Sequence, residues 1–595
     1  MIESVLIANR GEIAVRLIRA YRELGVRTVA VYSDADAAAL HVRLAEEAHR
    51  IGPAPAGGSY LNHRAILAAA RAAGAAAVDP GYGLLSEDAA FARAAIGAGL
   101  VFIGPPADAI EAMGDKVAAR AIAERAGVPV VPGSGVIATP EAGIGAARKL
   151  GFPLVVKSPF GGGGRGMRIV ADESRLADAL TASAAEAASA FGRPEVYLER
   201  HVREARHIEV QVLADACGNV LHLGDRDCSV QRRHQKLIEE APAPFLDDHV
   251  RERMRAAALS LATHVGYQST GTVEFLYDPA SGQFYFLEMN TRLQVEHGVT
   301  ELVTGLDLVA QRLAIAAGQP LAITQDDVRF RGHAIEVRLT AEDPWQSFLP
   351  RPGTISALHI PAGPWLRADF GVAAGDNVPS EYDSMFGKLI AWGPDRESAR
   401  RRLIAALGEL RLSGLPTTAP YLRDVLLQPA FVRGTHSTTS VEENWLPDPA
   451  GRPAVSGDRP GPVGDARARD RSTAMAVRLV EVHAADGPFR VAIASRQRHG
   501  TAGSEAGRRG VADRAADGSA DASRQPSAPM DGVVVKVEVQ PGDIVERHAA
   551  VTVIESMKMQ IPVTAPWPGE VRRVLVEVGD AVTAGQQVAE IGQAP

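Results

Sequence analysis

Asn290-Thr-Arg-Leu-Gln-Val-Glu-His297 is the stretch that most restricts the fold and chemistry of this chain, and it follows the strand-like run Phe286-Leu-Glu-Met-Asn290. A second strand-like run, Glu274-Phe-Leu, lies shortly upstream. The two runs predict adjacent strands that bring Glu274 and Glu288 close to Asn290. Such oxygen ligands suit Mg²⁺, which normally binds a few carboxylates together with substrate phosphates. Solvent-facing strand glutamates are the alternative, but their apolar neighbours favour a buried end of a sheet.

A lysine and a run of glycines lie earlier, in Lys157-Ser-Pro-Phe-Gly-Gly-Gly-Gly-Arg-Gly-Met167. Glycines let backbone N–H groups close over a phosphate, and the lysine adds a positive charge. A glycine run alone more often marks a flexible loop. Together with Lys116, in Met113-Gly-Asp-Lys116, and with the downstream motifs, it predicts a nucleotide-phosphate site.

The first hundred residues alternate strand-like and helix-like segments. Residues 5–8 are an apolar run, and Ile13, Leu17 and Tyr21 then recur at helical spacing. This alternation continues to about Gly104 and predicts a parallel sheet covered by helices. The first turn lacks Gly-x-Gly-x-x-Gly, so nothing indicates a dinucleotide site there.

Composition excludes several classes of protein. With 595 residues, of which 46% are apolar and 23% charged, the chain is an ordinary globular protein of several domains. A net charge of −8 without a basic stripe argues against nucleic acid as a partner. Cys217 and Cys228 cannot form a disulfide framework, and no Cys/His cluster has zinc spacing. Without a secretory leader or a long apolar stretch, we expect a cytoplasmic protein with no membrane partner.

The last quarter of the chain changes in composition twice. After about Leu446 it becomes rich in Pro, Gly, Arg, Asp, Ala and Ser, which is typical of a linker. Within it, residues 474–495 alternate like two strands and predict a small β-hairpin. Residues 497–528 hold hardly any large apolar side chain, so we expect disorder and a tethering role there.

After Pro529, short Val-rich strands and regular turns predict a compact all-β domain. Its sequence holds a weak repeat, because residues 532–543 resemble residues 569–580, and we expect two similar halves related by a pseudo-twofold axis. Between the halves lies Ile554-Glu-Ser-Met-Lys-Met559. Lys558 would sit at a hairpin tip, where its amine protrudes, although an ordinary exposed turn lysine is the alternative.

Residues 1–446 resemble biotin carboxylase, an α/β ATP-grasp enzyme, almost from end to end. The tail resembles the biotinyl carrier domain, and Glu555-Ser-Met-Lys-Met559 matches its biotinylation motif, whereas the Asp-Lys-Ala context of the related lipoyl domain is absent. The resemblance implies the following order: an N-terminal α/β domain (1–112), an ATP-grasp domain (113–330) with a lid at about 130–203, a C-terminal α+β part (331–446), a linker (447–528), and an all-β carrier (529–595).

The resemblance also implies roles for individual residues. Glu296 would deprotonate bicarbonate, Arg292 would steady the oxyanions of carboxyphosphate and the biotin enolate, and Arg338 would meet the biotin ureido oxygen. Bicarbonate is a poor nucleophile until a base removes its proton, so the chemistry needs such a set. A plain Arg292–Glu296 salt bridge is the alternative. The resemblance further implies that bicarbonate contacts Lys236, Gln294 and the Val295 backbone, and that Mg²⁺, or Mn²⁺ in its place, binds Glu274, Glu288 and Asn290. Biotin would be attached covalently to Lys558. ATP would contact Lys116, Lys157, the lid glycines Gly161, Gly162, Gly163 and Gly164, Glu199, Arg200, His201, Val202, His207, Gln231 and His234.

Two positions in this region depart from the family pattern. Asp79 stands where His is common, and Gly298 stands where Pro is usual. The glycine adjoins the proposed base and permits other backbone angles there, which would affect catalytic efficiency. A further family motif, Tyr382-Asp-Ser-Met-Phe-Gly-Lys388, is assigned to packing and dimer support rather than to chemistry.

The implied reaction uses ATP and bicarbonate to carboxylate biotin on Lys558. Residues 447–595 are too short for a carboxyltransferase, so we expect a separate carboxyltransferase β subunit, because the chain resembles the α subunit of bacterial acyl-CoA carboxylases. A biotin protein ligase and further copies of this chain are the other expected partners. Two alternatives stay open: the equivalent subunit of a pyruvate carboxylase or other biotin enzyme, and a carrier or scaffold with a weakened ATP-grasp region.

Overall fold

The computed structural model describes residues 2–137, 139–158, 167–448, 476–484, 487–495, 525–557 and 559–593. Three sequence predictions fall outside these residues: the glycine loop 161–164, the attachment site Lys558, and the character of linker residues 449–475 and 496–524. The chain divides into a larger unit, Met1–Ser456 with Gln525–Pro595, and a smaller one, Gly457–Arg524.

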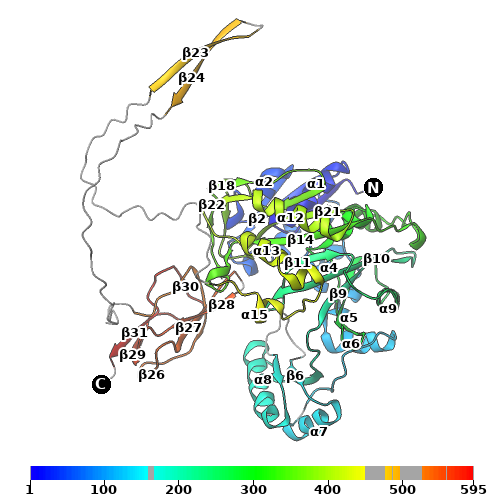
Figure 1. Ribbon diagram of the computed structural model, residues 1–595, viewed down its shortest axis with the longest axis vertical. Helices are drawn as coiled ribbons and strands as arrows, with labels where there is room; N and C mark the ends of the chain where they lie inside the picture. Colours follow the sequence, from blue (N-terminus) through cyan, green and yellow to red (C-terminus); the bar gives the residue numbers. More distant parts are fainter. Residues whose placement is uncertain are drawn as a thin grey trace. The chain divides into compact units, whose positions relative to one another are not determined.

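The larger unit begins with the expected parallel sheet (Figure 1). Residues on its central strand alternate between two cores, since Val5 and Ile7 pack with the first helix while Leu6 packs on the opposite face. Burial on both faces is the usual condition of a parallel sheet. Its strands lie in the order β3 (Glu47–Gly52), β2 (Arg27–Ser33), β1 (Ser4–Ile7), β4 (Ala77–Asp79) and β5 (Val101–Phe102), with α1 (Gly11–Glu23), α2 (Leu40–Leu44), α3 (His63–Ala72) and α4 (Ala89–Gly97) between them.

A small antiparallel sheet with two helices lies within the segment predicted to be the lid. Its strand order is β7 (Arg168–Val170), β6 (Leu154–Lys157) and β8 (Tyr197–Arg200), and the helices are α7 (Pro140–Leu150) and α8 (Leu176–Phe191). Leu154, Val156 and Leu180 belong to a separate core of this layer. The register places Val155 opposite Glu199 and Lys157 opposite Tyr197, so two predicted nucleotide contacts lie on neighbouring strands.

An eight-stranded antiparallel sheet forms the centre of the larger unit. It runs across the predicted domain boundary at residue 330, because β11 pairs directly with β14. The strand order is β13 (Gln283–Asn290), β12 (Ser269–Asp278), β9 (Arg206–Ala214), β10 (Val220–Arg232), β11 (Gln235–Ala241), β14 (His333–Thr340), β21 (Met385–Gly393) and β19 (Leu366–Phe370).

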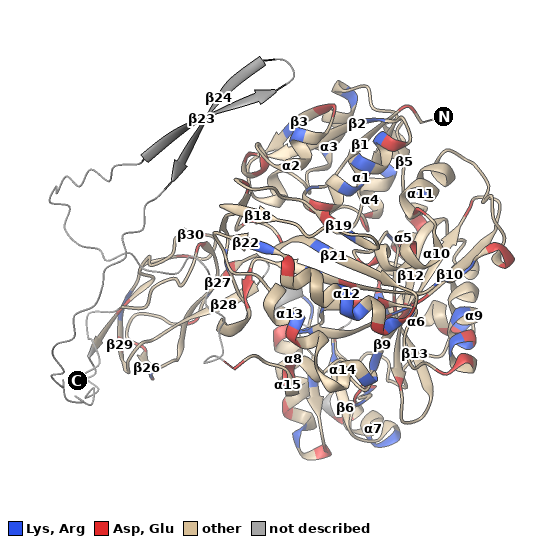
Figure 2. Ribbon diagram, turned by 45° about the horizontal axis from the view of Figure 1, so that its top comes forward, with Lys and Arg blue, Asp and Glu red and all other residues tan. Residues whose placement is uncertain are grey.

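Helices pack around this sheet, and charged residues of both signs are interspersed on them (Figure 2). Before β14 these are α5 (Ala107–Gly114), α6 (Lys116–Arg125), α9 (Asp248–His264), α10 (His297–Thr304) and α11 (Leu308–Ala316). After it come α12 (Arg396–Glu409), α13 (Ala419–Leu426), α14 (Pro429–Arg433) and α15 (Ser440–Asn444). Short two-stranded pairs complete this part: β15 (Glu342–Asp343) with β16 (Leu349–Pro350), β17 (Gly353–Thr354) with β20 (Asn377–Val378), and β18 (Ala357–His359) with β22 (Arg411–Ser413).

The tail is an all-β domain whose two halves exchange strands. β25 (Gly532–Val537) pairs with β30 (Ala581–Val582), and β29 (Gly569–Val574) pairs with β26 (Ile544–Val545), so each half contributes to the other's sheet. The turns match as well: Asp543 accepts from the amide of Gln540 at 2.7 Å, and Asp580 accepts from the amide of Glu577 at 2.8 Å. The internal repeat therefore corresponds to a structural repeat. The remaining strands are β27 (Ala550–Ser556), β28 (Met559–Thr564) and β31 (Ala589–Gln593).

The smaller unit contains the predicted hairpin. β23 (Ala476–Ala484) and β24 (Gly487–Ser495) pair antiparallel, with Ala484 opposite Gly487. Across the parts of the chain that the structure describes, no helix is long and apolar enough to cross a membrane.

Candidate functional site

The candidate site lies on one face of the central sheet. β12 and β13 are adjacent, as the sequence predicts, and their register places Glu274 opposite Glu288 and Thr272 opposite Asn290. β9 supplies His207 and Glu209, which share a face because alternate strand residues point the same way. Lys236 extends from β11 toward the same place, and residues 294–297 complete the site where α10 begins.

The ammonium group of Lys236 connects three buried carboxylates. Its Nζ atom donates to Glu209 at 2.6 Å, to Glu274 at 2.8 Å and to Glu296 at 2.6 Å. Burial alone would lower the pKa of Lys236, but the three carboxylates raise it well above its ordinary value. Lys236 is therefore a permanent cation placed between the predicted metal ligands and the predicted base.

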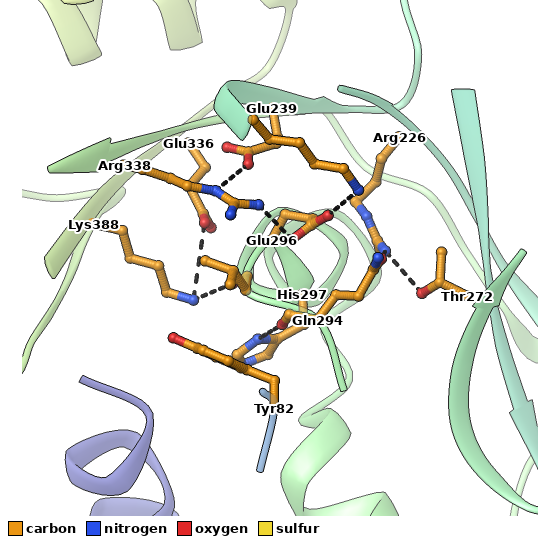
Figure 3. A network of polar contacts seen from close by, with 12 residues as sticks. Tyr82, Arg226, Glu239, Thr272, Gln294, Glu296, His297, Glu336, Arg338 and Lys388 are labelled. Carbon is orange, nitrogen blue, oxygen red and sulfur yellow. Dashed lines mark hydrogen bonds and ion pairs between the residues drawn. The ribbon is translucent and has the colours of Figure 1, made fainter. Parts of the chain in front are cut away.

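Glu296 is held as a carboxylate between two cations (Figure 3). Arg338 donates from Nη2 to its Oε2 at 2.9 Å, while Nε of Arg338 is bound to Glu239 at 2.5 Å. Burial tends to raise the pKa of Glu296, yet Lys236 and Arg338 hold it well below its ordinary range. Glu296 is therefore deprotonated at neutral pH and lies beside two cationic side chains, which is the protonation state that a proton acceptor must start from.

Glu274 is the most heavily bonded acid of the site. Its Oε1 accepts from Lys236, from Asn290 and from Gln294, each at 2.8 Å, and its Oε2 lies 3.0 Å from Nε2 of His207. Despite burial, Lys236 and His207 hold the pKa of Glu274 well below its ordinary value. Burial and the nearby charge of Glu274 raise the pKa of Glu288.

The donor set suits a divalent cation on chemical grounds. Glu274 and Glu288 are register partners, and a dication between them would relieve the repulsion that disfavours the second negative charge. Asn290 adds an amide oxygen beside them, which accepts from Arg292 at 2.7 Å. Lys116 approaches from α6, with its Nζ 3.9 Å from Glu288. The prediction that Glu288 is buried holds only in part, since its side chain is 41% exposed.

Arg292 is anchored by a residue of the N-terminal sheet region. Its Nε donates to Glu87 at 2.8 Å, and the amide of Thr291 donates to the other carboxylate oxygen at 3.0 Å. Glu87 thus fixes both the backbone and the guanidinium at the start of the motif. Arg292 does not contact Glu296 directly, which argues against the simple salt bridge considered from sequence.

The predicted nucleotide contacts lie mainly on the small sheet and around the β10–β11 turn. Lys157 donates to Glu199 at 2.5 Å, and Arg120 donates to the other oxygen of Glu199 at 2.9 Å. Three of the remaining predicted contacts, Arg200, His201 and Val202, directly follow Glu199 in the chain. Gln231 is buried at the end of β10, and His234 lies in the β10–β11 turn, where its φ is positive. Gly161–Gly164 and Lys558 are outside the described residues, so their predicted roles remain predictions.

The two departures from the family pattern have local partners. Asp79 is fully buried and forms a bidentate ion pair with Arg312, at 2.9 and 3.0 Å, and also accepts from Tyr21. Gly298 lies in the first turn of α10, where an added Cβ would come within 2.2 Å of Cδ1 of Ile390. Arg312 thus pairs with the charge of Asp79, and Ile390 fills the space beside Gly298.

Sequence reasoning missed several residues that the structure places in the site. Arg226 is completely buried, and its guanidinium holds Glu209 at 2.5 Å and Gln294 at 2.7 Å. The spacing of Glu209 two residues after His207 could have indicated a shared face. Nothing in the local sequence could have linked Glu87 or Arg226 to the site, because each contact joins distant parts of the chain.

Four family models match the chain. They are described as "Biotin carboxylase, N-terminal domain" (residues 1–110), "Carbamoyl-phosphate synthase L chain, ATP binding domain" (115–324), "Biotin carboxylase C-terminal domain" (336–443) and "Biotin-requiring enzyme" (525–591). Together they cover the carboxylase region and the tail, in the order that the sequence predicts.

Named relatives agree with these models. A biotin carboxylase of Nostoc sp. is 50% identical over 74% of this chain and 99% of the relative. A pyruvate carboxylase subunit of Methanothermobacter thermautotrophicus is 48% identical, over 74% and 90%. The propionyl-CoA carboxylase alpha chain of Ruegeria pomeroyi is 46% identical, over 75% and 68%.

Solved structures support the same assignment. The biotin carboxylase of Campylobacter jejuni in complex with β,γ-ATP is 45% identical, with a TM-score of 0.72, over 74% of this chain and 99% of the other. The biotin carboxylase domain dimer of Hydrogenobacter thermophilus 2-oxoglutarate carboxylase, with MgADP, ADP and bicarbonate, is 44% identical, with a TM-score of 0.71, over 74% and 98%. The chain therefore belongs to the biotin carboxylase family and is a biotin-dependent carboxylase subunit that combines an ATP-dependent biotin carboxylase with a biotin-carrier domain.

Proposed function

We propose that Glu296 takes a proton from bicarbonate and that the resulting anion takes the γ-phosphoryl group of ATP, which gives carboxyphosphate and ADP. The carboxyl group then passes to biotin on Lys558 with release of phosphate, for transfer to an acyl-CoA by a separate subunit. The observation that carries this proposal is the position of Glu296 between Lys236 and Arg338, at 2.6 and 2.9 Å. Both cations are fixed by other carboxylates, so they are preorganised for anions and need little rearrangement when substrate binds.

Bicarbonate would replace part of the present ion-pair network. Lys236 and Gln294 both point at Glu274, and the Val295 backbone lies next to the base, so an oxyanion could bind within reach of all three. The bicarbonate bound by the Hydrogenobacter relative supports this choice of substrate.

The nucleotide would lie between the small sheet and the central sheet. Lys157 is paired with Glu199, and Lys116 lies near Glu288, so phosphate oxygens would compete for both ammonium groups. The glycines 161–164, Arg200, His201, Val202, His207, Gln231 and His234 are proposed as further contacts. Glu274, Glu288 and Asn290 would hold Mg²⁺, which neutralises phosphate charge when bound.

We assign biotin attachment to Lys558 on the Met-Lys-Met motif between β27 and β28. Attached biotin supplies a ureido nitrogen that takes up the carboxyl group. Arg338 would donate to the ureido oxygen, and Arg292, held by Glu87, would bind the oxyanions beside it. Intact-mass spectrometry after coexpression with a biotin protein ligase should show one biotin per chain, lost in Lys558→Arg. An unchanged mass shift in that variant would disprove the assignment.

An acyl-CoA is the proposed acceptor, and a carboxyltransferase β subunit the proposed partner, within the cytoplasm. The support is the relative named as a propionyl-CoA carboxylase alpha chain. A homo-oligomer is favoured by the relative described as a domain dimer. The second candidate is a pyruvate carboxylase subunit, which the 48% identical Methanothermobacter relative favours.

Two measurements test the proposal. Purified protein should cleave ATP in a bicarbonate-dependent manner with free biotin, whereas a carrier or scaffold with a weakened site would not. Native copurification, followed by carboxylation assays with acyl-CoAs and with pyruvate, then identifies the acceptor and the second subunit. Carboxylation of pyruvate alone would replace the acyl-CoA proposal with the second candidate.

A further inference from the structure

Lys388, at the end of a motif that the sequence assigned to packing, reaches the segment that carries the proposed base. Lys388 (Figure 3) lies on β21, and its side chain is completely buried. Its Nζ donates a hydrogen bond to the carbonyl oxygen of Val295. Val295 directly precedes Glu296. A lysine is rarely buried without a specific partner, because its ammonium loses hydration.

Three carboxylates from different parts of the fold keep this ammonium charged. Nζ lies 3.5 Å from Glu12 of α1, 3.9 Å from Glu336 of β14 and 4.0 Å from Asp369 of β19. Burial by itself would lower the pKa of Lys388, yet these groups raise it. Tyr82, three residues after Asp79, donates to Glu12.

The hydrogen bond fixes the plane of one peptide unit in the site. In a trans peptide the C=O and the following N–H point in opposite directions. Because Lys388 holds the Val295 carbonyl, the N–H of Glu296 must face away from Lys388. The neighbouring peptide is held in the same manner, since the Gln294 carbonyl accepts from the His297 amide at 3.3 Å and lies 2.8 Å from Nδ1 of the His297 ring.

The two fixed peptides directly precede α10. Glu296 is the residue before the first turn of this helix, and its own carboxylate meets Lys236 and Arg338. Backbone N–H groups at a helix N-terminus favour an anion, and here a substrate anion is expected. The positive charge that holds the Val295 carbonyl is that of Lys388, and it lies on the opposite side of the peptide from the N–H group of Glu296.

We propose that Lys388 is a positioning residue for bicarbonate: through the Val295 carbonyl it orients the 295–296 backbone and the Glu296 side chain toward the anion. This inference rests on the proposed function, because it assumes that bicarbonate binds at Glu296. Lys388 does not touch the substrate and transfers no proton. Its expected contribution is to the apparent affinity for bicarbonate, whereas the nucleotide contacts on β6, β8 and α6 are independent of it.

The test is steady-state ATP cleavage by the full-length chain, with bicarbonate and ATP varied separately. Lys388→Met should raise the KM for bicarbonate by roughly 10-fold or more, as expected for about 1.4 kcal/mol of lost binding, and leave the KM for ATP within about 2-fold. Removing a buried cation leaves acids unpaired, so the variant Lys388→Met/Glu12→Gln is made in parallel. It removes the cation together with one of the acids beside it, and the new amide oxygen can still accept from Tyr82.

Arg396→Met is the matched control. Arg396 is a half-buried cation of α12 paired with Glu240 at 2.6 and 2.9 Å, and its described contacts do not include residues 294–297. It should lower the melting temperature without changing the ratio of the two KM values. If Lys388→Met and the double variant behave like this control, the positioning role is wrong. If the unaltered protein shows no bicarbonate dependence, the proposed function fails together with this inference.

Discussion

Nζ of Lys236 lies 2.6 Å from Oε1 of Glu296, and both groups are nearly excluded from solvent. The pair keeps the proposed base ionised, and bicarbonate would replace this one contact while Glu209 and Glu274 still hold the ammonium. Glu296→Gln retains size and hydrogen bonding but cannot take up a proton. We predict that bicarbonate-dependent ATP cleavage falls by at least about 100-fold, while the dissociation constant for ADP changes little.

Glu240→Gln serves as the control for this change. Glu240 lies on β11 and pairs with Arg396 and His333, away from Glu296. Replacing it should cost stability but keep most of the bicarbonate-dependent turnover. Near-normal turnover in Glu296→Gln would show that another group removes the proton.

The buried ion pair between Asp79 and Arg312 predicts strong coupling of two substitutions. Removing either partner leaves the other charge buried, which costs about 3–5 kcal/mol. Asp79→Ala and Arg312→Met should each lower the free energy of unfolding by that order. The double variant should lose much less than the sum, as urea denaturation will measure. Additive losses would mean that the pair contributes no interaction energy.

Gly298 and Ile390 predict a steric compensation. A Cβ at residue 298 would come within 2.2 Å of Cδ1 of Ile390, so Gly298→Ala should destabilise the chain by about 1–3 kcal/mol. Ile390→Val removes that Cδ1 atom and should make the alanine tolerable. Urea denaturation of both single variants and of the double variant checks this. Equal losses for alanine in the two backgrounds would show that backbone freedom, not space, requires glycine.

Burial raises the pKa of Glu342 to about 7, and this predicts a pH dependence of stability. The folded state then binds a proton that the unfolded state releases above about pH 4.5, so stability is lost as pH rises toward 7 and levels off above it. The loss is about 3 kcal/mol, since one pKa unit corresponds to about 1.4 kcal/mol. Glu342→Gln cannot titrate, so its stability relative to the unaltered chain should improve by this amount between pH 4.5 and 8. A constant difference would contradict the prediction.

Much of the fold was predictable from local patterns. The apolar run of residues 5–8, followed by a helical pattern, indicates a strand of a parallel sheet covered by helices, and the repeat of residues 532–543 in 569–580 indicates two similar halves. Both signals depend on neighbours within a few residues, where periodicity and turn-forming glycines are informative. The adjacency of the strands that carry Glu274 and Glu288 was also predicted, whereas the register that pairs these two residues comes from the structure.

The sequence by itself determined which groups are available for chemistry: the residues proposed as oxygen ligands, Lys116 and Lys157, the Arg292–Glu296 motif, the proposed carrier lysine Lys558, and their order along the chain. Only the tertiary structure decided which of these groups hold one another. Glu87 is 205 residues from Arg292, and Lys388 is 93 residues from Val295, yet each pair is in direct contact. Such contacts arise because burying a charge costs more than local propensity can offset, so each buried ion takes whichever partner the packing of distant segments brings within reach.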